Sequence, residues 1–255
     1  SKKYLGEQID IHAGGEDLIF PHHENEIAQS EAANGKEFSR YWMHNGFLNI
    51  DNRKMSKSLG NFFTVREISE KYDLQVLRFF MLSAHYRSPL NFSAELMEAA
   101  KSGLERIITA ADRLKFLMGS AKTEDMAETE AEKFAKSAEY VGNFESAMDD
   151  DFNTADAIAA VFDLVKFINT MTDEDSSKEY LENLFDRLVR LTEVLGIIVD
   201  KEDEILDSDI EALIAERQAA RKEKNFARAD EIRDELLAKG IVLKDTREGV
   251  QWKRA

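Results

Sequence analysis

The chain of 255 residues contains no cysteine and only two prolines, and none of its apolar runs approaches the ~20 residues that a membrane-spanning helix needs. Without cysteine the chain forms no disulfide and offers no thiolate ligand to a metal, which is consistent with the reducing cytoplasm. The scarcity of proline and the abundance of Ala, Glu, Leu and Lys favour helix over most of the length. We therefore expect a mostly α-helical, cytoplasmic protein without a membrane-spanning segment.

Basic residues are scarce as well. The 34 Lys and Arg residues stand against 50 Asp and Glu, which gives a formal net charge of −16. This charge argues against a general nucleic-acid-binding protein, because neutralisation of phosphates dominates that kind of affinity. The distribution is uneven, however: from residue 217 onward, 11 Lys and Arg exceed 7 Asp and Glu. A contact with RNA therefore stays open at this end of the chain.

The first 92 residues contain alternating strand and helix signals. Residues 4–12 predict a strand that ends at a glycine turn, and Pro21 suits the first turn of a helix that reaches about residue 33. Residues 41–50 predict a second strand. Strand, glycine loop, helix and strand in this order are typical of an α/β nucleotide-binding domain, of which only the second part is present.

Helix signals dominate after residue 63. A capping box at 64–67 begins a short helix, and the helix expected at 73–84 has its apolar positions at Leu74, Leu77, Phe80 and Met81. Longer helices with apolar faces are expected at 93–118, 131–148, 154–170 and 177–195. They predict an antiparallel helical bundle over residues 93–203.

Residues 204–255 change character and predict a small α+β domain. Two short helices are expected at 208–224 and 226–239, followed by a hairpin that pairs 241–243 with 250–252. Trp252 and several cations lie in this hairpin, where Trp252 could stack on an RNA base or anchor the core.

The most informative motif is Lys-Met-Ser-Lys-Ser at 54–58, which runs into Leu-Gly-Asn. Such a segment can fold over a polyphosphate, and the flexible ammonium of lysine suits charge that moves during phosphoryl chemistry. Alone, the string is more often a solvated basic turn. A second unusual stretch at 10–26, about thirty residues upstream, favours the functional interpretation.

Two residues of that stretch are candidate metal ligands. His22 and Glu26 are four residues apart on a predicted helix, so both point to one face and can share an ion such as zinc. A helix-stabilising His–Glu pair has the same spacing, and two ligands do not complete a tetrahedral site. His23 and Glu24 are adjacent candidates whose directions around the helix differ.

Four further residues are candidates for nucleotide binding. Gly14 and Gly15 allow a ligand to approach the backbone closely. Asp17 can accept hydrogen bonds from ribose hydroxyls, or serve as an ordinary turn carboxylate. His12 lies at the end of its strand, where ligands bind in open α/β sheets, although it could equally pack in a core. His44 and His85 could line the same site or simply pack.

Together these motifs resemble the cysteinyl-tRNA synthetase family of class I aminoacyl-tRNA synthetases. The resemblance rests on residues 8–30, on Tyr-Trp-Met-His-Asn-Gly at 41–46 and on Lys-Met-Ser-Lys-Ser-Leu-Gly-Asn-Phe at 54–62. It continues through Met-Asp-Asp-Asp-Phe-Asn-Thr at 148–154 to Gly-Ile-Val-Leu-Lys at 240–244 and Gln-Trp at 251–252. It thus covers essentially the whole chain.

The resemblance implies ATP-dependent ligation of L-cysteine to its tRNA through a cysteinyl-adenylate. By it, Lys54 and Lys57 are catalytic residues of a mobile loop, and Lys57 binds ATP. Gly14, Gly15, Asp17 and His12 are then expected at the ATP or adenylate. His22 and Glu26 match two ligands of a zinc ion that binds the substrate thiolate and so rejects serine. A monomer is expected.

The family's two remaining zinc ligands, which are cysteines, and its His-x-Gly-His motif would precede Ser1. We therefore expect residues 1–92 to be the C-terminal part of a Rossmann-like catalytic domain, 93–203 the helical bundle, and 204–255 the anticodon-recognition domain. The fragment alone is expected to hold zinc weakly or not at all, and to form no adenylate.

Three alternatives remain. A related ligase joins cysteine to an amino sugar, but such a small acceptor needs no distant RNA-reading surface. A non-catalytic RNA-binding module has no reason to keep both the 21–26 and 54–58 motifs. A nucleotidyltransferase with another substrate would lack thiol-dependent zinc chemistry.

Overall fold

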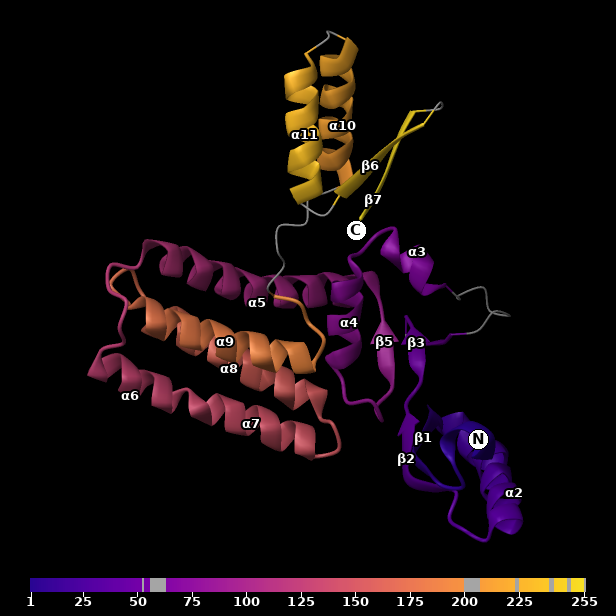
Figure 1. The fold of residues 1–255 in the computed structure, drawn as a ribbon. Helices are drawn as coiled ribbons and strands as arrows, with labels where there is room; N and C mark the ends of the chain where they lie inside the picture. Colours follow the sequence, from indigo (N-terminus) through magenta and orange to yellow (C-terminus); the bar gives the residue numbers. More distant parts are fainter. Residues whose placement is uncertain are drawn as a thin grey trace. The chain divides into compact units, whose positions relative to one another are not determined.

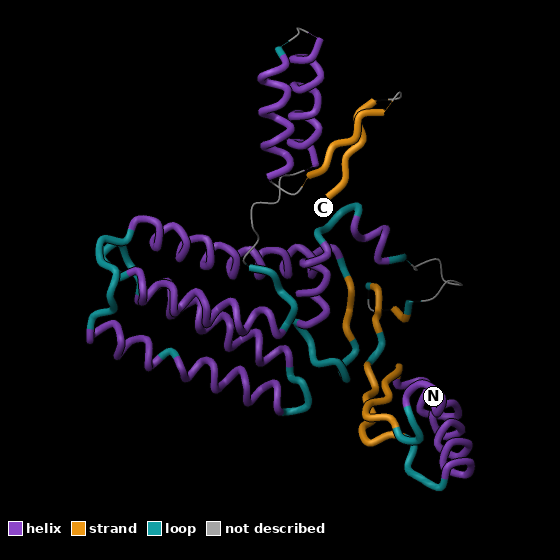
Figure 2. Tube along the Cα trace, in the orientation of Figure 1, coloured by secondary structure: helices purple, strands orange, loops and turns teal. Residues whose placement is uncertain are grey.

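The computed structural model describes residues 1–51, 53–55, 63–199, 207–222, 225–238, 241–246 and 249–254. The chain divides into two compact units, Ser1–Asp200 and Lys201–Ala255. Helices make up most of both, and the strands form small sheets (Figures 1 and 2). The expectation of a mostly helical protein with an α/β portion is confirmed. The boundary expected between residues 92 and 93 lies inside the first unit and stays a prediction.

A strand–helix–strand unit lies near the beginning of the chain. Strands β1 (Ile9–Gly15) and β2 (Ser39–Asn45) pair in parallel, and α2 (Glu24–Asn34) connects them. Helix α2 ends where Gly35 adopts a φ of 65°, a left-handed conformation that favours glycine. This arrangement confirms the predicted α/β pattern.

The predicted strand at 4–12 was wrong at its beginning. Lys2–Leu5 form a helical turn, α1, which ends at Gly6 with φ 91°. The pairing with β2 begins only at Ile9, opposite Ser39, so the residues before it have no strand partner in the described part of the chain. Tyr4 and Leu5 are correspondingly exposed.

The strand expected at 41–50 is two strands, separated at Gly46. In the second sheet, β3 (Leu48–Ile50) lies between two strands. It pairs with β4 (Arg53–Lys54) in antiparallel orientation and with β5 (Leu90–Phe92) in parallel orientation. The Gly46 amide donates to the Tyr86 carbonyl oxygen at 2.8 Å. A Cβ at Gly46 would lie 2.6 Å from the Ser88 carbonyl carbon, so only glycine fits there.

Two short helices follow. The predicted capping box begins α3 (Val65–Ser69): the Glu67 amide donates to Thr64 Oγ1, and the Thr64 amide donates to the Glu67 carboxylate. In α4 (Leu74–Leu82) the buried side chains are Val76, Phe79 and Phe80. Leu74 and Met81, which we expected on the apolar face, are about half exposed. Apolar residues surround most of this helix, so periodicity alone did not identify its buried side.

The bundle consists of α5 (Ala94–Ser120), α6 (Glu128–Lys136), α7 (Ala138–Asp149), α8 (Thr154–Met171) and α9 (Lys178–Val194) (Figure 1). Its core contains fully buried apolar side chains, among them Met97, Ile107, Leu114, Leu164, Ile168, Leu184 and Leu188. The single helix expected at 131–148 was wrong, because the helix breaks at Ser137. The buried Ser137 hydroxyl donates to the Phe134 carbonyl oxygen and accepts from Arg187 Nη1, which competes with helix continuation.

A buried carboxylate joins α6 to the start of α9. Glu130 accepts hydrogen bonds from the Ser177 amide at 2.9 Å, the Ser177 hydroxyl at 2.6 Å and the Ala127 amide at 3.0 Å. Burial acts to raise the pKa of Glu130, but these hydrogen bonds outweigh it, so the pKa lies below its ordinary value.

Replacement of Glu130 by alanine is expected to lower the free energy of unfolding by about 2–4 kcal/mol, because buried donors lose a charged acceptor. Urea unfolding followed by circular dichroism measures this, with Glu132→Ala, exposed on the same helix, as the control. Since folding lowers the pKa of Glu130, its contribution is present at neutral pH and disappears as the pH falls below about 4.5. Equal stability of the two variants would contradict this.

The second unit contains two helices and a hairpin. Helices α10 (Asp207–Lys222) and α11 (Phe226–Ala238) pack against β6 (Ile241–Thr246), which pairs with β7 (Gly249–Arg254). Ile214, Ile232, Leu236 and Ile241 form its core. The predicted helix pair is confirmed, and a hairpin follows it, but its expected pairing was wrong. Residues 241–243 pair with 252–254, and Leu243 lies opposite Trp252, because both strands extend further toward the turn than expected.

Among the described residues, no helix combines the length and the apolar character that crossing a membrane requires.

Candidate functional site

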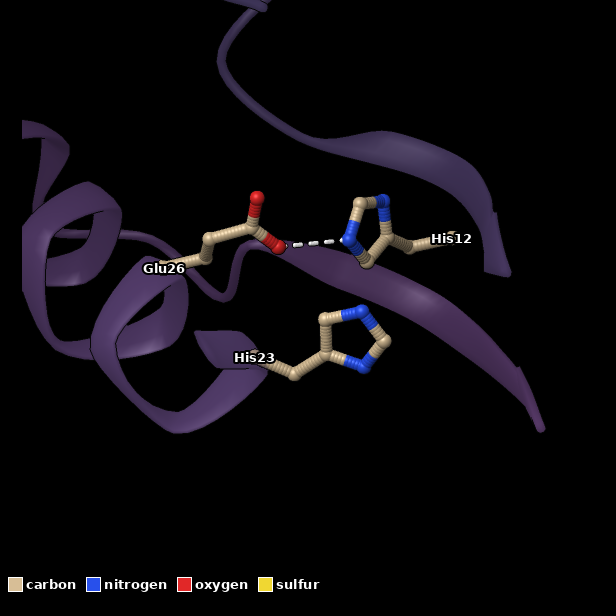
Figure 3. A group of neighbouring side chains, drawn as sticks. All are labelled: His12, His23 and Glu26. Atoms are coloured by element: carbon tan, nitrogen blue, oxygen red, sulfur yellow. Dashed lines mark hydrogen bonds and ion pairs between the residues drawn. The ribbon is translucent and has the colours of Figure 1, made fainter. Parts of the chain in front are cut away.

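Three polar side chains meet beside the first sheet (Figure 3). His12 Nε2 and Glu26 Oε2 are 2.6 Å apart, and His23 lies next to them. One potential ligand atom from each of His12, His23 and Glu26 lies within 4.8 Å of the others. His23 is buried, whereas Glu26 is exposed and His12 is intermediate. The group is thus open on the carboxylate side.

Local backbone structure brings these residues together. His12 comes from β1, and Glu26 from the first turn of α2. Between them the chain forms a 3-10 turn, Glu16–Leu18, and an irregular turn, Ile19–His23, which is kinked at the extended residue Phe20. His23, at the end of this turn, stands three residues before Glu26, a spacing that places side chains side by side on a helix.

Aromatic rings surround the group. His12 packs edge-on against Trp42 with ring centroids 4.7 Å apart, and the buried Phe38 lies 5.4 Å from His12. A hydrogen bond of 2.8 Å joins His23 Nδ1 to His44 Nε2. Burial lowers the pKa of His44, and the nearby His23, Arg87 and His12 add to this effect. His44, which comes from β2, therefore favours its neutral form at neutral pH.

The donors suit a zinc ion. Imidazole nitrogen and carboxylate oxygen are common zinc ligands, and tetrahedral zinc takes about four. His12, His23 and Glu26 supply three donors from three chain segments, so the group fits zinc by its chemistry. Because the chain has no cysteine, it can supply no thiolate as the fourth.

The structure places the predicted metal pair only in part. Glu26 belongs to the group, but His22 is exposed and does not. The sequence pattern disfavoured His23, because its direction around a regular helix differs from that of His22 and Glu26. The three-residue spacing to Glu26 was the available signal for His23, whereas the contribution of His12 depends on the packing of β1 against α2 and had no local signal.

Gly14 and Gly15 are in close contact with the chain's own side chains. A Cβ at Gly14 would lie 2.8 Å from His23 Cε1, and one at Gly15 would lie 2.6 Å from Asp17 Oδ1. Glycine at 14 thus allows the His23 ring to sit against β1. Asp17 lies in the 3-10 turn with an exposed side chain. Gly14 and Gly15 are the last residues of β1 and Asp17 follows them, so all three lie at the carboxyl end of a parallel strand. The expected end of the strand at His12 was wrong, because the pairing with β2 continues through Gly15 and leaves His12 in the middle of β1.

Of the two predicted catalytic lysines, Lys54 lies in the described part of the chain. Lys54 is the last residue of β4, where its backbone pairs with Asn49. Lys57 and both serines of the motif lie outside the described residues. His85, the other histidine considered for the site, instead faces Asp151 in the loop between α7 and α8, at 3.7 Å.

Three family models match the chain in sequence. They are described as tRNA synthetases class I (C) catalytic domain for residues 1–102, DALR domain for 143–199, and cysteinyl-tRNA ligase anticodon binding domain for 203–252. Among solved structures, the Agrobacterium radiobacter LeuRS in a ternary complex with tRNA has a TM-score of 0.60 at 19% identity, covering 76% of this chain and 28% of that one. The Mycobacterium tuberculosis methionyl-tRNA synthetase bound by methionyl-adenylate has a TM-score of 0.56 at 20% identity, covering 73% and 41%. These two likenesses concern the fold alone.

Curated relatives match over the entire chain. The cysteine--tRNA ligase of Lachnospira eligens is 69% identical over 255 residues, which are 100% of this chain and 54% of the relative. That of Lachnoclostridium phytofermentans is 58% identical, again covering 100% of this chain and 55% of the relative. The chain therefore belongs to the cysteinyl-tRNA synthetase family and spans about half the length of the curated relatives it matches.

Proposed function

We propose that the full-length protein that includes this chain ligates L-cysteine to its tRNA with consumption of ATP. The observation that carries the proposal is the 69% identity to a cysteine--tRNA ligase across all 255 residues. The match of residues 203–252 to a cysteinyl-tRNA ligase anticodon-binding domain favours this function over the amino-sugar ligase. The match of residues 1–102 to a catalytic domain disfavours the non-catalytic RNA-binding module.

The reaction has two steps. In the first, a carboxylate oxygen of cysteine attacks the α-phosphorus of ATP, and the bond to pyrophosphate breaks. In the second, a ribose hydroxyl at the 3′ end of the tRNA attacks the cysteinyl carbonyl carbon, and AMP leaves. Lys57 and Lys54 are proposed to stabilise the charge that develops on the phosphates. Gly14, Gly15 and Asp17 are proposed to contact the adenosine, with His12 beside them.

Zinc is the proposed metal. Glu26 is proposed as one ligand, and the resemblance implies His22 as a second. In the structure it is His23 and His12 that lie beside Glu26, so they are the alternative ligands. When bound, zinc would supply a position that prefers thiolate sulfur to a hydroxyl, and so favour cysteine over serine. The remaining ligands would come from the part of the relatives that this chain does not match.

The second unit is proposed to bind the anticodon region of the tRNA, in keeping with its match to a cysteinyl-tRNA ligase anticodon-binding domain. The full-length enzyme is proposed to be a cytoplasmic monomer. Substitution of both Lys244 and Lys253 by alanine is expected to lower tRNA affinity about tenfold at roughly 0.1 M salt, because two phosphate contacts are lost. The difference should shrink at higher salt. Filter binding measures it, with Arg233→Ala as the control, since that guanidinium already pairs with Asp230 and Asp234. Equal affinity of the double variant and the parent would argue against a tRNA-binding role for these two lysines.

The test of the function is aminoacylation by the full-length product of the open reading frame that encodes this chain. We expect transfer of radiolabelled cysteine to tRNA that depends on ATP, and no comparable transfer of serine. Transfer of cysteine to an amino sugar instead would favour the alternative ligase.

A further inference from the structure

Asp151 connects the helical bundle to the segment that follows α4. It lies in the loop between α7 and α8, and both of its carboxylate oxygens are engaged. Tyr86 Oη donates to Oδ1 at 2.8 Å, and Arg87 Nε donates to Oδ2 at 2.5 Å. The Arg87 guanidinium also stacks over the Tyr86 ring at 5.4 Å from its centroid. One carboxylate thus holds two consecutive side chains of the other segment.

The backbone of this loop is held in an unfavourable conformation. Asp151 and Phe152 have φ values of 56° and 54°, in the left-handed region that non-glycine residues rarely adopt. Such conformations persist where the surrounding contacts determine them, and they cluster at functional positions. The adjacent Thr154 hydroxyl donates to the Leu82 carbonyl oxygen at 2.8 Å, which fastens the same loop to the end of α4.

The segment that Asp151 holds also supports the candidate site. The Tyr86 carbonyl oxygen accepts the Gly46 amide, and the Ser88 backbone leaves no room for a side chain at Gly46. Gly46 follows directly after β2 and stands two residues from His44. His44 in turn is hydrogen-bonded to His23 of the His12–His23–Glu26 group. A continuous series of contacts therefore leads from the bundle to the site.

We propose that Asp151 is a positioning residue, whose carboxylate fixes Tyr86 and Arg87 and thereby sets the position of the β2 end that carries His44 into the site. The proposal rests on the proposed function, because the reaction it affects is cysteine activation. Asp151 does not contact substrate itself in this role. Its loss should slow the chemical step while leaving substrate binding nearly unchanged.

The test compares Asp151→Asn with Asp151→Gly in the full-length product. Asparagine tolerates a positive φ, removes the charge and replaces one of the two acceptor oxygens by an amide donor, whereas glycine relieves the backbone and removes every side-chain contact. We expect both variants to lower kcat of cysteine-dependent ATP–pyrophosphate exchange about tenfold, because small misplacements of reacting groups are costly. KM should change less than about twofold, since the residue acts on geometry rather than on binding.

The control is Asp175→Asn, which removes an exposed carboxylate of the same bundle that pairs with Lys122 at 2.8 Å. It should leave kcat unchanged. A kcat within about twofold of the parent for both Asp151 variants would overturn the proposal, as would an equal loss in the control. If the parent itself shows no cysteine-dependent exchange, the proposed function fails instead.

A second readout does not need activity. In the full-length product, hydrogen–deuterium exchange of the peptide that contains β2 reports on this region, where the Trp42 ring lies against His12 and His23. Asp151→Gly should increase the exchange of the β2 amides, while Asp175→Asn should leave it unchanged. Unchanged exchange of β2 in the Asp151 variant would overturn the proposal independently of any assay of the reaction.

Discussion

Replacement of Lys57 by alanine in the full-length product is expected to lower the rate of cysteinyl-adenylate formation about 100-fold. The ammonium of Lys57 is proposed to follow the charge that develops on the phosphates as pyrophosphate leaves. Loss of one such preorganised charge removes stabilisation from the transition state without removing the contacts that bind tRNA. Affinity for tRNA should therefore stay the same.

Single-turnover formation of the adenylate, with tRNA filter binding in parallel, measures both quantities. Lys71→Ala is a matched control, because it removes an exposed lysine from the turn that follows α3, close to the motif in the chain. Equal rates for Lys57→Ala and the parent would remove Lys57 from the proposed chemistry. A parallel loss of tRNA affinity would indicate a binding role instead.

The second large effect is expected at Glu26. Glu26→Gln should lower the zinc affinity of the full-length product at least about 100-fold, because a carboxylate ligand is replaced by a weaker neutral one. Cysteine activation should fall with the zinc content, and removal of zinc from the parent by a chelator should have the same effect. Atomic absorption on the purified proteins measures the metal, with Glu24→Gln as the control.

The same measurement distinguishes the two neighbouring histidines. If His22 is the ligand, as the resemblance implies, His22→Ala loses zinc and His23→Ala retains it. If instead the ligands are the histidines that lie beside Glu26 in the structure, His23→Ala and His12→Ala lose zinc. Full zinc content in Glu26→Gln would contradict a metal role for this carboxylate altogether.

Much of the fold follows from local sequence signals. The capping box at Thr64, the left-handed glycine after α2 and the helices of the bundle each depend on a few neighbouring residues, and each was predictable. The breaks at Gly46 and Ser137 were not. Both depend on partners distant in the chain, the Tyr86–Ser88 backbone for Gly46 and Arg187 for Ser137.

In the candidate site, too, some features follow from neighbouring residues and others depend on partners distant in the chain. Glu26 and the glycines were predicted from the local sequence, and His12 from its expected place at the end of a strand. The meeting of His12 with Glu26 depends on the tertiary contact between β1 and α2. The position of His23 depends on the kinked turn at Ile19–His23, which spacing rules for a regular helix do not contain. The contact of Asp151 with Tyr86 and Arg87 joins residues more than sixty positions apart, which a single sequence does not reveal.

The most direct measurement is cysteine-dependent ATP–pyrophosphate exchange by the full-length product of the open reading frame that encodes this chain. The proposed function predicts rapid exchange with cysteine, and none above background with serine or without an amino acid. Absence of exchange with cysteine, or equal exchange with serine, would contradict it.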